Sequence, residues 1–433
     1  MTFSEAEDRP FETILSGPVA GAEGAAELAR DLDLGDLITA DVGGTSFDTC
    51  LITGGRPQMM YEGSVVGLPV QTPWVDVRSI GAGGGSLAYV DVGGLLRVGP
   101  GSAGADPGPA CYGRGGTQPT VTDAAFVLGM LGAGELAGGV RLDGEAARAA
   151  LAPLAEALSF EVDDVARGIL TIANANMANA IREITVEQGV DPRSATLVAF
   201  GGAGPLFGTL LARELELKEI VIPPYAGNFS AWGLLGADLT QSAALTRITR
   251  LDGDAVPDLD GVLGSLFEAL VSRAHDAGSD TGREIGFDMR YVGQEHTLTI
   301  GVPAAEGRIG ASVDDIHGLF TREYGRTFGH SMEEAVEIVS VRATLRTPLP
   351  RRAEERALLA SSNGHRGAGF EAYSFTRGEK LDFAIVDRST LTQDSSIEGP
   401  AIVIEDTATT YLDAGFTARL HESGSLFLTD EEG

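Results

Sequence analysis

The chain has 433 residues, of which 62 are acidic and 31 are lysine or arginine, and its formal net charge at pH 7 is −31. A nucleic-acid partner is not expected, because phosphate contacts require a basic face. The sequence has no run of about 18 apolar residues that could span a membrane, and its N-terminus lacks the basic and apolar segments of a signal peptide. We therefore expect a cytoplasmic protein.

The first informative stretch is residues 38–52, ITADVGGTSFDTCLI, in which a Gly-Gly-Thr turn separates two apolar arms. Alternation on both sides predicts a β-hairpin with its tip at residues 42–45. Glycine lets backbone amides approach a ligand closely, so Gly43, Gly44 and Thr45 could surround a phosphate group. Asp41 could hold Mg²⁺ through its water ligands. An ordinary tight turn is the alternative interpretation.

Two later segments imitate phosphate-binding signals. Residues 91–94 repeat the letters DVGG without the threonine, so the first copy is distinguished by Thr45, by a second acid at Asp48 and by a glycine loop far downstream. Residues 81–86, GAGGGS, look like a dinucleotide-binding loop, but the residues that follow predict a strand, and such a site needs a helix. No G-x-x-x-x-G-K-[ST] phosphate loop occurs in the chain.

The middle of the chain predicts a parallel α/β unit. Residues 162–189 carry apolar side chains at helical spacing and end in glycine, which predicts one long amphipathic helix. A buried strand is predicted at 195–200, followed by a glycine loop at 201–205, a helical run and a strand at 219–222. The order strand, loop, helix, strand is typical of a parallel sheet.

The pattern changes after about residue 245, where alternating strands at 287–302, 335–345 and 401–404 surround a helical segment near 313–328. We interpret residues 246–433 as a smaller α+β domain that follows an α/β domain over residues 1–245.

Several segments match motifs of one protein family. In chain order they are SGPVAGAEGAA (16–26), DVGGTSFD (41–48), IGAGGGS (80–86), GPGSAGADPGPACYGRGGTQPTVTDA (99–124), NANMANAIREITVEQGVDP (174–192), FGGAGPL (200–206) and IPPYAGNFSAWGLL (222–235). Together they resemble the hydantoinase A/5-oxoprolinase family. RYVGQEHTLTI (290–300), YGRTFGH (324–330) and GPAIVIED (399–406) resemble the C-terminal domain of the same family.

The resemblance implies an actin-like, ribonuclease H-like ATPase fold, in which two related domains close over a nucleotide. It implies ATP and Mg²⁺ as cofactors, with residues 41–45 matching the second phosphate loop. Gly201, Gly202 and Gly204 match the adenosine loop. The residues agree with this assignment, because a glycine loop before a helix that starts with proline offers flat backbone and free amides to a nucleoside.

Roles for single residues follow from the same resemblance. Asp41 is expected to bind Mg²⁺ and Asp48 to support it, both as catalytic acids. Asp123 is a further catalytic candidate, although its place before AAFVLGML also fits a helix N-cap. Arg78 and Asp106 lie in predicted loops that could meet the substrate. Arg78 and Phe207 depart from the histidine expected in many relatives.

Members of the family hydrolyse cyclic amides such as 5-oxoproline or hydantoins with consumption of ATP, and relatives are subunits of ATP-dependent ketone carboxylases. The first hypothesis is therefore a subunit of an ATP-dependent cyclic amidase that opens a hydantoin or lactam ring. The second is a subunit of an acetone- or acetophenone-type carboxylase, and the third is a non-catalytic nucleotide-binding scaffold. The family pattern also implies a hydantoinase B-type partner and a separate polypeptide that supplies the usual N-terminal domain.

Overall fold

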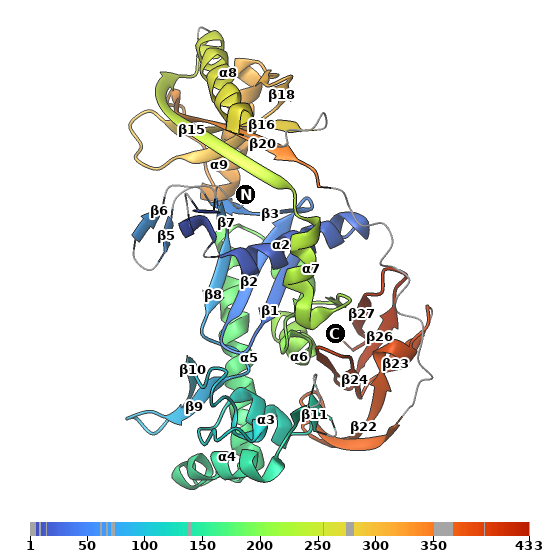
Figure 1. The fold of residues 1–433 in the computed structure, drawn as a ribbon. Coiled ribbons are helices and arrows are strands. Elements are labelled where there is room, and N and C mark those ends of the chain that lie inside the picture. The colour runs from blue at the N-terminus through green and yellow to red at the C-terminus, as the bar shows by residue number, and fades with distance from the viewer. Residues whose placement is uncertain are drawn as a thin grey trace.

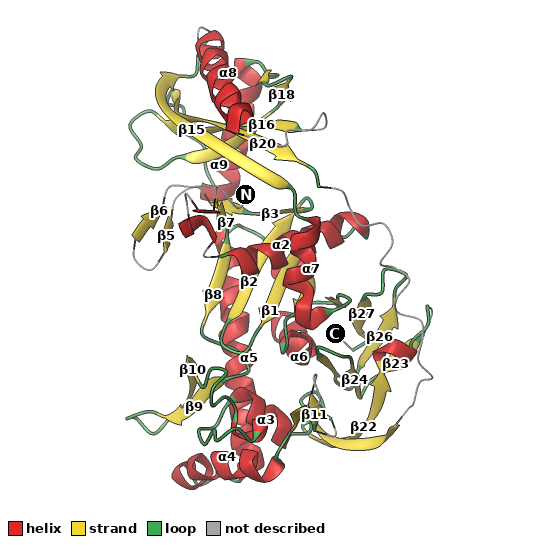
Figure 2. Cartoon of the chain, in the orientation of Figure 1, coloured by secondary structure: helices red, strands yellow, loops and turns green. Residues whose placement is uncertain are grey.

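A mixed sheet of nine strands forms the centre of the molecule (Figures 1 and 2). The computed structural model describes residues 6–7, 10–13, 15–60, 63–65, 68–70, 74–132, 134–136, 140–253, 255–273, 281–349, 367–393 and 395–432. In spatial order the central strands are β23 (Ser396–Glu398), β26 (Phe416–Leu420), β27 (Leu426–Asp430), β14 (Glu219–Ile222), β13 (Thr196–Phe200), β1 (Leu37–Val42), β2 (Phe47–Thr53) and β3 (Arg56–Pro57), with β8 (Val77–Ile80) also paired to β2.

The predicted hairpin and the predicted α/β unit meet in this sheet. β1 and β2 are antiparallel, with Val42 opposite Phe47, while β1, β13 and β14 are parallel to one another. Both predictions are confirmed, because β13 is followed by α6 (Gly204–Leu215) and then by β14. The long helix is confirmed as α5 (Val162–Glu187), whose apolar face packs in the central core.

Four more helices pack around this sheet and α5. The side chains of α2 (Ser16–Asp31) and α7 (Phe229–Gly236) pack closely, because Gly24 and Gly233 let the two backbones approach: a Cβ on Gly24 would lie 2.9 Å from the Gly233 Cα. α3 (Val121–Val127) and α4 (Gly144–Leu158) pack beside α5 at the lower end of the molecule (Figure 1).

The glycine run at 81–86 leads into β9 (Ser86–Val90), which pairs with β10 (Leu96–Ser102), so the predicted strand is confirmed. The second DVGG copy forms the turn between them. Asp91 Oδ1 accepts hydrogen bonds from the amides of Gly93 (2.9 Å) and Leu95 (3.0 Å), and Oδ2 accepts one from Arg97 Nε (2.8 Å). This copy is an ordinary hairpin turn, as the missing threonine indicated.

A second hydrophobic core lies apart from the first, at the top of Figure 1. It is built from β15 (Leu239–Arg250), β20 (Val336–Thr347), β16 (Gly282–Tyr291), β17 (Leu298–Val302), α8 (Ala255–Arg273) and α9 (Val313–Phe328). The helix predicted near 313–328 is confirmed, and it begins with a capping box in which Ser312 and Asp315 bond each other's backbone amides.

Residues 246–433, which were expected to form one C-terminal domain, contribute to both hydrophobic cores. β21 (Gly367–Ser374), β22 (Glu379–Asp387), β24 (Ala401–Ile404) and β25 (Thr409–Leu412) form a sheet whose buried residues belong to the first core. β27 pairs with β14, with Glu219 opposite Thr429. The last part of the chain therefore returns to the central sheet, because β14 would otherwise expose an unpaired edge.

Short elements complete the chain. They are η1 (Pro10–Thr13), β4 (Met59–Met60), β5 (Gly63–Val65), β6 (Leu68–Val70), β7 (Trp74–Val75), η2 (Ala110–Tyr112), β11 (Glu135–Leu136), β12 (Val140–Arg141), η4 (Pro192–Ser194), η5 (Ala226–Asn228), β18 (Ala304–Ala305), β19 (Arg308–Ile309) and η7 (Arg388–Thr390). Within the described ranges, no helix has both the length and the apolar character needed to cross a membrane.

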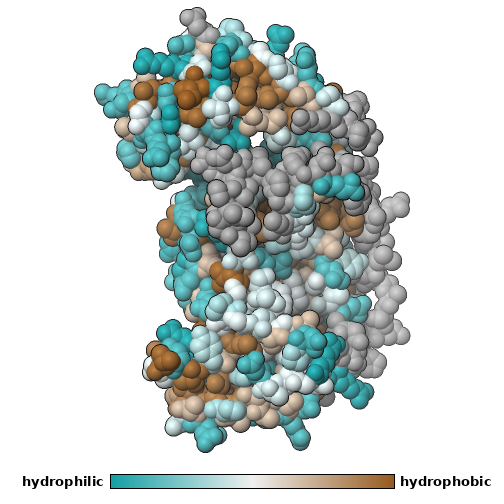
Figure 3. Space-filling view, turned by 60° about the vertical axis from the view of Figure 1, so that its left-hand side comes forward, coloured by the Kyte–Doolittle hydropathy of each residue, from teal (hydrophilic) through white to brown (hydrophobic). Residues whose placement is uncertain are grey.

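The visible face in Figure 3 carries hydrophobic residues near both its upper and its lower end. Figure 3 shows hydrophobic residues gathered at the lower end of the visible face, where the β9–β10 hairpin and α4 lie. Val92, Leu95 and Tyr89 on the hairpin and Phe160 after α4 are exposed and belong to neither core.

Candidate functional site

A cavity of about 470 Å³ opens where the predicted glycine loops come together. Its walls are the β1–β2 tip, the glycine run after β8, the loop before α3, the start of α6 and the turn between β24 and β25. The lining residues are Gly43, Gly44, Thr45, Gly84, Gly85, Gly104, Ala105, Pro109, Tyr112, Arg114, Thr122, Leu131, Gly202, Ala203, Leu206, Ile404, Glu405, Thr407, Ala408 and Thr409. Of the predicted cofactor-binding residues, Gly43, Gly44, Thr45 and Gly202 lie on this wall.

The hairpin tip presents backbone donors to the cavity. Gly43 N donates to Ser46 O at 3.0 Å, which closes the turn, whereas in the described chain the amides of Gly44, Thr45 and Gly202 donate to no protein acceptor. Ser102 Oγ lies 3.4 Å from the Thr45 hydroxyl. Unpaired amides in a turn favour an anion, so this wall suits phosphate oxygens.

The glycine run at 83–85 contacts the backbone of the β1–β2 tip and hydrogen-bonds to it, a role that the sequence analysis missed. Gly84 N donates to Gly43 O at 3.0 Å and Gly85 N donates to Gly44 O at 2.6 Å. A Cβ on Gly83 would lie 2.7 Å from Gly43 O and from Thr45 N. The close approach of two backbones explains why this run contains no side chains, although it is not a dinucleotide loop.

The downstream glycine loop contacts the same hairpin. Gly201 has φ +81°, and a Cβ there would lie 2.4 Å from Asp41 Oδ1 and 2.5 Å from Val42 O. Ala203 N donates to Val42 O at 2.9 Å. Gly204 starts α6, where a Cβ would lie 3.0 Å from Ala40 O. Gly201 and Gly204 therefore hold the two loops together, and Gly202 between them lines the cavity.

Asp41 and Asp48 face each other across the hairpin. Burial raises the pKa of Asp41 to about 6, the hydrogen bond that Ser230 Oγ donates to Oδ2 (3.0 Å) opposes the shift, and the nearby charge of Asp48 adds to it. Asp48 Oδ2 accepts from Ser46 Oγ at 3.0 Å, while Oδ1 is buried without a hydrogen-bond partner in the described chain. Neither carboxylate is among the residues that line the cavity.

Two features of this carboxylate pair are compatible with a bound Mg²⁺ ion. Mg²⁺ usually binds through one or two carboxylates and completes its shell with waters and phosphate oxygens. Asp48 has a buried oxygen without a hydrogen-bond partner, which a cation could bind. A cation beside Asp41 would stabilise its charged form and so lower its raised pKa. In the described residues no three His, Cys, Asp or Glu side chains form a metal cage, so phosphate and water would have to supply the remaining ligands.

Asp123 has a clear structural role. It is fully buried, and its carboxylate accepts from the amides of Ala110 (3.2 Å), Cys111 (2.7 Å) and Thr120 (3.0 Å) and from the Thr120 hydroxyl (2.8 Å). The N-cap of α3 is Thr120, and Asp123 is the third helical residue of a capping box, so the expected cap was placed three residues too late. The capping contacts secure the loop that carries Tyr112 and Arg114.

The two candidate substrate residues are not brought to the cavity. Arg78 pairs with Asp76 (3.0 Å) and with Glu183 (3.8 Å) and Glu187 on α5. Asp106 is exposed beyond the lining residues Gly104 and Ala105. Phe207 lies on α6, and its side chain is buried in the central core. A substrate role for Arg78 or Asp106 would therefore lie outside this cavity.

Sequence reasoning missed the two charged side chains of the lining. Arg114 is the only basic residue and Glu405 the only acidic residue among the described residues that line the cavity. Glu405 Oε1 accepts from Arg388 Nη1 at 2.8 Å, and burial raises the pKa of Glu405 against the effect of that arginine. Both residues lie inside the quoted family motifs, but no local spacing indicates that CYGRGG and VIED meet.

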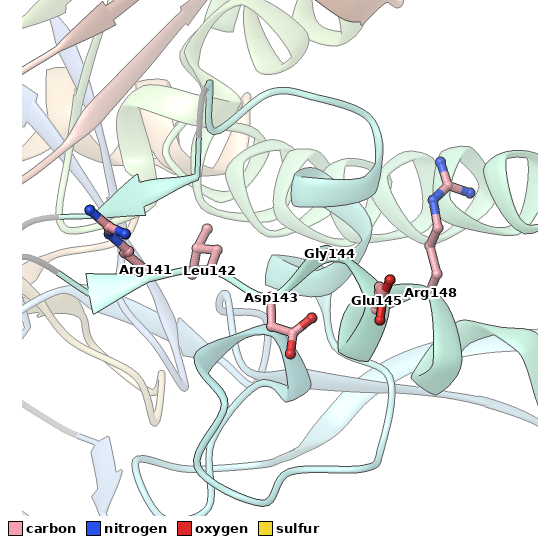
Figure 4. A pocket seen from close by; sticks show the side chains of 6 residues that line it. All are labelled: Arg141, Leu142, Asp143, Gly144, Glu145 and Arg148. Carbon is pink, nitrogen blue, oxygen red and sulfur yellow. The ribbon is translucent and has the colours of Figure 1, made fainter.

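A second hollow, of about 620 Å³, lies on the surface where β12 leads into α4 (Figure 4). Arg141 and Arg148 stand at opposite ends of it in Figure 4. Asp143 caps α4 by accepting from Ala146 N at 3.0 Å, and Arg148 pairs with Asp163 at 2.8 Å. Its polar groups serve the local fold and do not converge, so we place no site there.

Two family models match most of the chain. Residues 1–243 match the family model described as hydantoinase/oxoprolinase, and residues 267–430 match that of the hydantoinase/oxoprolinase C-terminal domain. The chain is 32% identical over 437 residues to caprolactamase subunit alpha of Pseudomonas jessenii. The alignment covers 98% of this chain and 62% of the relative.

Two solved structures are similar over nearly the whole chain. The ATP-dependent caprolactamase from Pseudomonas jessenii matches with a TM-score of 0.82 at 30% identity, over 95% of this chain and 61% of that one. A nucleotide-free acetone carboxylase matches with a TM-score of 0.75 at 25% identity, over 96% and 61%. The chain thus spans about three fifths of the length of these relatives. It belongs to the hydantoinase/oxoprolinase family.

Proposed function

We propose that this chain is a subunit of an ATP-dependent cyclic amidase that opens a hydantoin or lactam ring and binds Mg-ATP in the cavity described above. The observation that carries the proposal is the meeting of two glycine loops around unpaired amides at Gly44, Thr45 and Gly202. The similarity to an ATP-dependent caprolactamase, an enzyme named for a lactam, supports the substrate class.

We also infer that the central sheet belongs to the actin-like ATPase class. The support is its topology, in which the β1–β2 hairpin continues into the parallel strands β13 and β14. In that arrangement the hairpin tip carries the phosphate loop, and the turn after β13 carries the nucleoside loop. The structure places both turns on one cavity.

The chain's own residues would divide the work of binding. The amides of Gly44 and Thr45 and the Thr45 hydroxyl would hold phosphate oxygens, and Arg114 would neutralise part of their charge. Asp41 and Asp48 would hold Mg²⁺, which supplies charge neutralisation when bound. Arginine and amides are needed here because the chain has only two lysines, Lys218 and Lys380, and neither lines the cavity.

ATP would be needed to activate the substrate, because an amide is hydrolysed only very slowly by water at neutral pH. Transfer of the γ-phosphoryl group to the amide oxygen makes the ring carbon more electrophilic, so water adds to it and the ring C–N bond breaks. Hydrolysis of the resulting acyl phosphate then releases phosphate. Positioning and electrostatic stabilisation supply most of the catalysis of such transfers, which suits an amide-lined site.

The second candidate is a subunit of an ATP-dependent carboxylase, which the similarity to acetone carboxylase favours. Both candidates imply partners, because the relatives are subunits of multisubunit enzymes, and we propose a hydantoinase B-type subunit as one partner. Turnover assays of the assembled complex with and without bicarbonate separate the two reactions. A folded chain that binds nucleotide but shows no turnover with any partner would instead be a nucleotide-binding scaffold.

Calorimetric titration of Mg-ATP into the purified chain tests the nucleotide site. Asp41→Asn should weaken binding by about 10- to 100-fold, since a contact with a charged group contributes roughly 1.5–3 kcal/mol. The matched control is Asp91→Asn, because Asp91 occupies the same place in the second DVGG turn, away from the cavity. Unchanged affinity in the Asp41 variant would refute its metal assignment, and no binding by the folded chain would refute the nucleotide site.

A further inference from the structure

Glu405 lies in the turn between β24 and β25, which forms part of the cavity wall. Its amide donates to Ala408 O at 3.1 Å, which ties the turn between β24 and β25. Thr407 packs against Gly227 so closely that a Cβ on that glycine would lie 2.2 Å from Thr407 O. The turn is therefore fixed against the body of the sheet, and the Glu405 side chain has a defined place on the cavity wall.

A buried arginine fixes the orientation of this carboxylate. Arg388 Nη1 donates to Glu405 Oε1 at 2.8 Å, and Nη2 donates to Ile222 O (3.0 Å) and Gly424 O (2.8 Å). The two side chains are only 4% and 12% exposed. Oε1 is thus occupied, whereas no donor in the described chain reaches Oε2. Glu405 is only partly buried, and Oε2 is not one of the buried polar atoms that lack a partner, so it can accept a hydrogen bond from water or from a ligand in the cavity.

We propose that Glu405 Oε2 accepts hydrogen bonds from the ribose hydroxyls of the bound nucleotide, an inference that rests on the proposed nucleotide site. The triphosphate is repelled by a carboxylate and is drawn to the amides of Gly44 and Thr45 and to Arg114. The base suits the apolar part of the lining, Leu131 and Ile404. The ribose diol offers hydroxyl donors without negative charge, and carboxylates recognise ribose hydroxyls in dinucleotide sites by the same chemistry.

Glu405 would then be a specificity-determining residue that selects ribonucleotides. Glu405→Gln makes a sharp test, because Arg388 is a donor and requires the amide oxygen of the glutamine. The amide NH₂ then replaces Oε2, so the charged acceptor is lost, although the NH₂ group can still donate a weaker hydrogen bond to a hydroxyl oxygen. The variant keeps the shape of the side chain and should lose much of the discrimination.

The experiment is calorimetric titration of the full chain with Mg-ATP and with the Mg complex of 2′,3′-dideoxy-ATP, for wild type, Glu405→Gln and Asp406→Asn. Asp406 is the matched control, since it is the exposed neighbour and does not line the cavity. Wild type and the control should bind ATP about 10- to 100-fold more tightly than the dideoxy analogue, the range for hydrogen bonds to a charged group. In Glu405→Gln the ratio should fall by about threefold or more, because a neutral hydrogen bond to the ribose hydroxyls is weaker than one to a charged group.

Equal affinity of the wild type for the two nucleotides would overturn the proposal, and this arm does not depend on the folding of any variant. Retained discrimination in a folded Glu405→Gln chain would also overturn it. Mg-ITP adds a further arm, because a preference that follows the 6-amino group of the base would place Glu405 beside the base. Failure of every nucleotide to bind would instead refute the proposed nucleotide site, so the two failures are distinguishable.

Discussion

Replacing Gly83 by alanine should displace the proposed phosphate loop without changing the identity of any residue that would contact the ligand. The added Cβ would lie 2.7 Å from Gly43 O, from the Gly44 carbonyl carbon and from Thr45 N, all of them backbone atoms. Ordinary van der Waals contact begins at 3.4 Å, so the tip must retreat by about 0.7 Å. Overpacking of this kind costs roughly 1–3 kcal/mol of stability.

The effect on binding should be of the same order as the effect on stability, since a tenfold change in affinity corresponds to about 1.4 kcal/mol. A misplacement of about 1 Å can cost about 100-fold where geometry must be accurate, so we expect Mg-ATP affinity to fall at least tenfold. Calorimetric titration gives the affinity, and differential scanning calorimetry shows that the fold persists. Gly101→Ala is the matched control, because it lies in the adjoining strand β10 and its Cβ would approach only Leu87 Cδ1, at 3.8 Å. Wild-type affinity and melting temperature in Gly83→Ala would refute the reasoning.

Three further predictions follow from the same site. Arg114→Gln should weaken Mg-ATP binding about tenfold or more, because it removes the basic side chain of the cavity wall, and it should leave the melting temperature unchanged, because that side chain is exposed. Arg97→Gln in β10, away from the cavity, should leave the affinity for Mg-ATP unchanged. Asp123→Asn should lower the free energy of unfolding by about 2–4 kcal/mol, since its new NH₂ group faces buried donors; an unchanged denaturation midpoint would contradict this. The pKa of Asp41 rises from 3.8 to about 6 on folding, so the folded chain holds a proton that the unfolded chain releases between these pH values. In metal-free buffer the stability of wild type relative to Asp41→Asn should therefore be highest below pH 4 and fall as the pH rises through 6, and parallel pH profiles for the two proteins would refute it.

Much of the local structure could be read from the sequence, because each pattern reports a short-range preference. Helical spacing and a terminal glycine predicted α5, and alternation around a Gly-Gly-Thr turn predicted the β1–β2 hairpin. The threonine distinguished the first DVGG copy from the second, which the structure shows to be a simple turn around Asp91. These features need only residues that are close neighbours in the chain.

Only the tertiary structure decided which distant segments share a wall. The pairing of β27 with the edge of β14 was not indicated by the sequence, since edge pairing between segments far apart leaves no local signal. Gly83 and Gly201 are glycines because other backbones approach them, and Glu405 meets the cavity only because Arg388 and Gly227 fix its turn. The residue pattern of the sequence was sufficient to recognise most of the central secondary-structure elements and the family motifs of this protein. Backbone packing and buried charge pairing decided the site, because both depend on contacts that exist only after the chain has folded.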